Sequence, residues 1–151
     1  MSKKKPVIVE KRAWPLEVRE AAEGNAYVLE GYASVFEDWA DIGGMFFERI
    51  MPGAFKKTLA EADQVALWNH NDQYPLGRKS ADTLELREDE HGLAFAIRLD
   101  PEIQYHRDAY LAAQKQLIKG ASFRFSVPGG KEDWDRDDDE ALRRTIRSAV
   151  V

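Results

Sequence analysis

Three segments of the chain carry the hydrophobic patterning that is typical of strands. Residues 27–36 are rich in aromatic and β-branched side chains. Residues 82–88 and 92–99 alternate apolar with polar positions on either side of a turn at 90–92 that contains a glycine. We therefore predict strands near 27–36, 82–88 and 92–99, with the last two paired as a hairpin.

Shorter segments extend this pattern. Residues 46–50 are predicted to form another short strand, and the compact apolar run QVALW predicts a strand over 64–69. Residues 122–127 place their large apolar side chains at alternate positions. The C-terminal residues 142–151 are predicted to form a last strand. Between these strands, the acidic residues 132–140 predict a solvated loop.

Two segments have helical rather than strand-like spacing. Residues 53–62 carry apolar side chains at intervals of four and three, and residues 101–119 form the longer helix. Asp100 can cap the longer helix, and Gly120 follows its end. Its apolar stripe consists of Ile103, Tyr110, Ala113 and Leu117.

Strands outnumber helices, and the two do not alternate as they would in a parallel α/β fold. The fold class expected from this order is α+β, built on a mainly antiparallel or mixed β-barrel flanked by the two helices. The strands expected to share this one curved sheet or barrel are 27–36, 64–69, 82–88, 92–99 and 122–127.

The length, net charge and cysteine content of the chain indicate how many domains it has and which partners it can bind. The 151 residues suffice for one domain, and we expect a mobile basic leader over 1–13 and a single domain over 14–151. A net charge of −5 argues against a nucleic-acid surface. No apolar run reaches the length of a membrane span, so no membrane partner is expected. The chain has no cysteine, which excludes disulfides and thiolate zinc sites.

The three histidines are the main candidates for chemistry. No two of them have the spacing of four residues by which a helix presents two zinc ligands, so neither a metal site nor another cofactor is predicted. His91 lies at the hairpin turn, where exposure is expected. His106 lies off the apolar stripe of the longer helix, and the pattern predicts a surface residue.

His70 follows an apolar strand, which would hold it on a rigid element. Its position is compatible with a core residue, a metal ligand, a surface residue or a general base. Neutral imidazole can accept the proton of a serine hydroxyl near pH 7, and Ser122 opens an alternating strand. If 64–69 and 122–127 are neighbours, the two side chains could meet. Spacing alone does not decide this, since a serine at a strand start often binds a backbone group instead.

Four blocks in order resemble one known family. The blocks are LEGYASVFEDWADIGGMFFERIMPGAF, ALWNHNDQYPLGR, EHGLAFAIRLD and LIKGASFRFSV. Together they run from Leu29 to Val127 and are similar to the prohead (capsid-maturation) serine proteases of tailed bacteriophages, which are distantly similar to the herpesvirus assemblins. Here Asn71 stands where the family often has Asp, and Arg124 where it often has Gly.

The resemblance implies a function and a site. It implies a serine endopeptidase with a herpesvirus-protease-like fold, in which His70 is the general base and Ser122 the nucleophile. Candidates for the oxyanion or pocket contacts are Arg78, Gly77 and Phe123, and a third catalytic group is not assigned.

The resemblance also implies partners, a location and an incomplete C-terminus. Implied partners are the phage major capsid protein and scaffold segments, inside the prohead in the host cytoplasm, with the enzyme acting as a dimer. The family continues past Val151, so we expect a C-terminally truncated domain with little activity. Two alternatives remain: a catalytically silent capsid-assembly module of the same fold, and an unrelated metal-dependent hydrolase.

Overall fold

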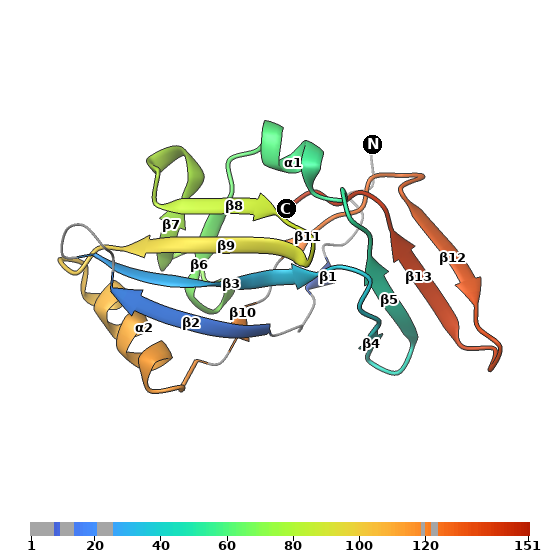
Figure 1. Cartoon of the computed structure of the whole chain (residues 1–151), viewed down its shortest axis with the longest axis horizontal. Coiled ribbons are helices and arrows are strands. Elements are labelled where there is room, and N and C mark those ends of the chain that lie inside the picture. Colours follow the sequence, from blue (N-terminus) through green and yellow to red (C-terminus); the bar gives the residue numbers. More distant parts are fainter. Residues whose placement is uncertain (1–7, 10–13, 21–25, 119, 122–123) are drawn as a thin grey trace.

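The structure of the chain is a computed structural model that describes residues 8–9, 14–20, 26–118, 120–121 and 124–151 (Figure 1). It contains strands in several sheets, two α-helices and two short 3-10 helices. The strands of the N-terminal half are β1 (Ile8–Val9), β2 (Trp14–Glu20), β3 (Tyr27–Val35), β4 (Ala40–Ile42), β5 (Phe46–Ile50) and β6 (Val65–Leu67). The later strands are β7 (Pro75–Arg78), β8 (Leu84–Glu88), β9 (Gly92–Leu99), β10 (Gly120–Ala121), β11 (Arg124–Phe125), β12 (Glu132–Arg136) and β13 (Leu142–Ile146). The helices are α1 (Lys56–Glu61), η1 (Trp68–His70), η2 (Lys79–Ala81) and α2 (Gln104–Gln114).

The largest sheet has five antiparallel strands in the order β10-β2-β3-β9-β8. It confirms the strands predicted near 27–36, 82–88 and 92–99 and the pairing of the last two. Strand β3 has an irregularity between Tyr32 and Ser34 where it pairs with β9. Gly92 pairs with Val35, just beyond this irregularity, and a Cβ atom there would meet the Ser34 carbonyl oxygen at 2.0 Å. A glycine is therefore required for the close approach of the two strands.

The prediction that five strands share one sheet or barrel is wrong in part. Strand β6 pairs with β7 in a separate two-stranded sheet, because the chain reverses directly after His70. Strand β11 pairs with β1, which lies inside the expected leader 1–13. Within the described residues the strands form separate open sheets and no closed barrel. The coarser class, α+β with mostly strands, holds.

A second sheet extends to one side of the first, in the order β12-β13-β5-β4 (Figure 1). Strand β13 runs parallel to β5 and antiparallel to β12. The solvated loop predicted at 132–140 is wrong for its first half, because Glu132–Arg136 is an edge strand. Hydrophobic patterning could not reveal this strand, since its side chains are almost all exposed and mostly charged.

Helix α2 covers the five-stranded sheet on the side of β2 and β3 (Figure 1). It is shorter than the predicted 101–119, because Asp100 accepts a hydrogen bond from the Glu102 amide in a turn before the helix begins. The prediction that His106 is a surface residue is wrong: it is 6% exposed. Its Nδ1 accepts a hydrogen bond from the Asp100 amide, and its Nε2 donates to the Pro75 carbonyl oxygen. With both ring nitrogens paired, burial of the ring leaves no polar atom unsatisfied.

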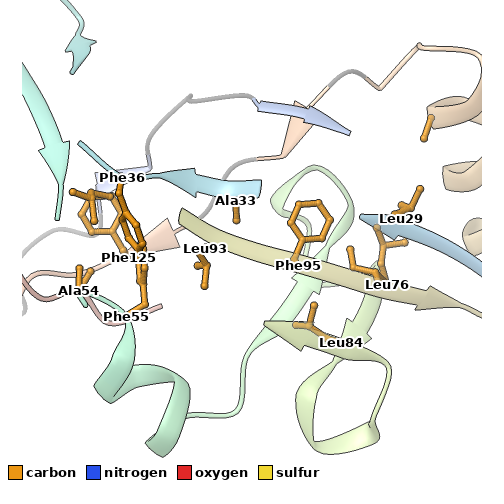
Figure 2. Close-up of a cluster of buried hydrophobic side chains, with 14 of the residues drawn as sticks. Leu29, Ala33, Phe36, Ala54, Phe55, Leu76, Leu84, Leu93, Phe95 and Phe125 are labelled. Carbon is orange, nitrogen blue, oxygen red and sulfur yellow. The ribbon is translucent and has the colours of Figure 1, made fainter. Parts of the chain in front are cut away.

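The apolar core has two parts that meet around Leu93 (Figure 2). One part holds Phe36 and Phe55, whose rings stack with centroids 6.2 Å apart, beside Phe125. The other part, around Phe95, lines a cavity that contains the candidate site. No helix among the described residues is long and apolar enough to cross a membrane.

Candidate active site

His70 lies at the end of β6, in the turn that leads back into β7. The turn is closed by hydrogen bonds from the Trp68 amide to the Tyr74 carbonyl oxygen and from the Asn71 amide to the Trp68 carbonyl oxygen. Asn69 and His70 both have a φ of 54°. Two successive residues with a Cβ atom in the left-handed region are unfavourable by themselves, so the surrounding contacts must stabilise the turn.

The His70 side chain is half-buried and lines a cavity of about 600 Å³. The cavity lies between the five-stranded sheet, the β6–β7 hairpin and the end of helix α2. Most of its walls are aliphatic or aromatic, and its charged or titratable side chains are His70 and Arg124. Several of its apolar lining residues are labelled in Figure 2: Leu29, Ala33, Leu76, Leu84, Leu93 and Phe95. The arrangement is an apolar hollow with one polar corner, as many ligand sites have.

Ser122 and Phe123 lie outside the described residues. The residues on either side of them, Ala121 and Arg124, both line the cavity that His70 lines. The Nη2 atom of Arg124 donates a hydrogen bond to the His70 carbonyl oxygen at 2.8 Å. The chain segments that carry the predicted base and the predicted nucleophile thus meet at one cavity, although they are far apart in the sequence.

Two effects lower the pKa of His70. Burial disfavours the charged imidazolium, and the positive charge of Arg124 adds to this in the same direction. At neutral pH the ring is therefore in its neutral form, which can accept a proton. This is the protonation state that a general base needs.

The structure does not bring Arg78 and Gly77 to the cavity. The Arg78 guanidinium binds the Asp63 carboxylate at 3.0 Å, and both side chains are largely exposed. A Cβ atom on Gly77 would lie 2.7 Å from the Thr83 carbonyl oxygen. Gly77 therefore has a packing role, in allowing β7 to approach the start of β8.

The other two histidines have separate surroundings. His91 is exposed in the β8–β9 turn, as predicted, and His106 binds backbone groups of α2 and β7. Among the described residues there is no group of three or more His, Cys, Asp or Glu side chains that could hold a metal ion.

Sequence reasoning noted Arg124 only as a departure from the family pattern and missed its contact with His70. The two residues are 54 positions apart, and an exposed arginine on an edge strand has no pattern that predicts its partner. His106 was missed as a buried residue for a similar reason, because both of its partners are backbone atoms.

Two comparisons with known proteins show which family the chain belongs to. A family model described as caudovirus prohead serine protease matches residues 14–151. The prohead protease of Enterobacteria phage HK97 is 35% identical over 121 residues, which cover 78% of this chain and 49% of that relative. The chain thus spans about half the length of that curated relative. No solved structure gave a significant match, so the herpesvirus-protease-like fold stays a prediction. The chain belongs to the caudovirus prohead serine protease family.

Proposed function

We propose that this chain provides the catalytic centre of a serine endopeptidase that cleaves scaffold and coat-protein segments during bacteriophage capsid maturation. The observation that carries the proposal is the meeting of His70 with Ala121 and Arg124 at one cavity. These two residues flank the segment that contains Ser122. Membership of the prohead protease family supports the same assignment.

In this mechanism the Ser122 Oγ attacks the carbonyl carbon of the scissile peptide while its proton passes to His70 Nε2. The imidazolium then donates that proton to the leaving amine, which leaves an acyl-enzyme. Water attacks the acyl-enzyme in the same way and regenerates the serine. The lowered pKa of His70 keeps the resting base neutral, so it is ready for the first step.

Two parts of the machinery remain open predictions. The oxyanion requires backbone amides or a cation close to the carbonyl oxygen. Phe123, through its amide, is the candidate nearest in sequence to the nucleophile, whereas Arg78 is paired with Asp63 and Gly77 is needed for packing. The group that would orient the His70 ring is not assigned, because Arg124 binds the backbone of His70.

The partners follow from the family. We propose the major capsid protein and scaffold segments of the phage as substrates, the interior of the prohead in the host cytoplasm as the location, and a dimer as the active form. Sedimentation at high micromolar concentration tests the dimer, and a monomer throughout would contradict it. We propose the herpesvirus-protease-like arrangement as the fold of the complete catalytic domain.

The decisive experiment is covalent labelling with a fluorophosphonate probe, followed by mass spectrometry of the labelled peptide. We expect the label on Ser122, and we expect Ser122→Ala and His70→Ala to abolish it. Ser126→Ala is a suitable control, because this serine lies on the same segment and is exposed. Absence of any label on Ser122 both in this folded chain and in the full-length protein would favour the alternative of a catalytically silent capsid-assembly module.

A further inference from the structure

The turn that carries His70 adopts an unfavourable backbone conformation. Asn69 has φ 54° and ψ 40°, and His70 also has a φ of 54°. The left-handed region brings the Cβ atom of an L-residue close to its own backbone, so a pair of such residues persists only where other contacts fix it. Three backbone hydrogen bonds among Trp68, Asn71 and Tyr74 close the turn.

Arg124 supplies a contact at the residue that matters for chemistry. Its Nη2 donates to the His70 carbonyl oxygen at 2.8 Å, and a charged donor makes a stronger hydrogen bond than a neutral one. The backbone of Arg124 is itself held in β11, where it pairs with Val9 of β1. The guanidinium therefore connects the His70 turn to strand β11, and both His70 and Arg124 line the cavity.

We propose that Arg124 is a positioning residue, which fixes the left-handed turn at His70 and thereby aims the imidazole into the cavity. The proposal rests on the proposed function only in taking His70 as the base. Arg124 acts through the backbone of His70, so its guanidinium need not contact the substrate.

The electrostatic surroundings of His70 support this assignment. Burial is the larger cause of its lowered pKa, and the charge of Arg124 is the second. No other charged side chain among the described residues lines the cavity, and Asp72, on the same turn, is exposed. Removal of the guanidinium should thus raise the pKa of His70, whereas a lysine should keep much of the charge effect.

The test compares Arg124→Met, Arg124→Lys and the control Arg98→Gln. Arg98 is exposed on β9, and its side chain alternates with the cavity-lining Phe95 and Ile97, so it faces away from the cavity. Two quantities are measured in each variant of the 151-residue chain: the NMR titration of His70 and the rate of fluorophosphonate labelling of Ser122. The His106 ring signal reports whether the fold is intact, because its two backbone partners lie away from Arg124 in the chain.

For Arg124→Met we expect a His70 titration at higher pH and labelling slowed by about 10- to 100-fold, since small misplacements of a base have effects of this size. For Arg124→Lys we expect a His70 titration near that of the parent, with labelling intermediate between the two. Arg98→Gln should match the parent in both. If Arg124→Met unfolds the chain, Arg124→Lys still tests the positioning role. Labelling of Arg124→Lys at the parental rate would mean that only the positive charge matters, and it would overturn the positioning role of Arg124.

The two proposals fail differently. If Arg124→Met leaves both the His70 titration and the labelling rate unchanged, the positioning role is wrong and the protease assignment survives. If Ser122 is labelled neither in this chain nor in the full-length protein, the protease assignment fails. The NMR titration and the backbone shifts of Asn69 and His70 then decide the positioning role alone: a change in Arg124→Met supports it, and no change overturns it.

Discussion

The five-stranded sheet β10-β2-β3-β9-β8 buries an apolar face, whereas the four-stranded sheet β12-β13-β5-β4 buries charges. In the first sheet, Leu93 and Leu99 are fully buried, and Leu93 lines the cavity. In the second, Glu48 is fully buried and binds Arg144 at 2.9 Å, and Arg144 also binds Glu132. The register places these three side chains on one face of their sheet, next to the Trp134 ring.

The difference has a physical consequence for function. Apolar contacts are non-directional, so an apolar wall tolerates a hollow that can admit a ligand. A buried charge that loses a partner is destabilised, because its desolvation is no longer compensated. We therefore expect the side chains of the ion-paired sheet to keep one arrangement. We therefore expect chemistry at the first sheet and a fixed framework at the second.

The largest expected effect is on activity, which should depend on residues at the cavity and not on an exposed residue of the four-stranded sheet. His70→Ala and Ser122→Ala should each lower the rate of Ser122-dependent cleavage or labelling at least about 10³-fold, and the double variant should be little worse, because the two side chains act as a unit. Asp138→Asn, in the exposed turn of the four-stranded sheet, is the control and should match the parent. Cleavage at the parental rate by Ser122→Ala would show that another group is the nucleophile.

The next effect concerns stability of the four-stranded sheet. Arg144→Ala removes the arginine that binds the fully buried Glu48 carboxylate and should lower the free energy of unfolding by about 3–5 kcal/mol. Glu48→Ala leaves Arg144 with its Glu132 partner and should cost less. Urea denaturation measures this. The exposed pair Arg87–Glu85, at 3.7 Å, is the control, and Arg87→Ala should cost less than about 1 kcal/mol. Equal losses in both pairs would mean that the buried charges are not what stabilises this sheet.

A smaller effect tests packing beside the cavity. Gly77→Ala would place a methyl group 2.7 Å from the Thr83 carbonyl oxygen, which is a backbone atom, so the strand must shift. We expect a loss of about 1–3 kcal/mol in the free energy of unfolding. Gly129→Ala has no neighbouring atom within 4 Å and should be close to neutral in the same urea titration. Should the two variants be equally stable, β7 can move away from β8 more easily than the structure implies.

The smallest effect is a pH dependence at the β8–β9 turn. A hydrogen bond from the Tyr32 hydroxyl, 2.6 Å long, lowers the pKa of Asp89, helped by the amides of His91 and Gly92. A lowered carboxyl pKa stabilises the fold above the ordinary pKa, and this contribution disappears as pH falls through the folded-state value. Tyr32→Phe should therefore cost under about 1 kcal/mol at neutral pH, because solvent still reaches this part-buried pair and screens it.

Urea denaturation of Tyr32→Phe and its parent across acidic to neutral pH provides the measurement. The difference between them should shrink on acidification as Asp89 becomes protonated. A difference that stays constant to low pH would attribute the loss to packing of the tyrosine ring.

Local sequence patterns were sufficient to predict the elements whose side chains alternate between a buried and an exposed face. Strands β3, β8 and β9 and the existence of both α-helices follow from local patterning, because one face of each element is apolar. The family could also be predicted from the sequence, since the motifs that carry the resemblance are local in sequence.

The tertiary structure alone decided the features that depend on contacts between distant segments. Strand β12 is charged at nearly every position and forms through pairing with β13, and β6 joins β7 because the His70 turn reverses the chain. His106 is buried by backbone partners, and Arg124 reaches a carbonyl oxygen 54 residues away. Backbone groups are the same in every residue type, so no sequence pattern identifies which of them a side chain will bind.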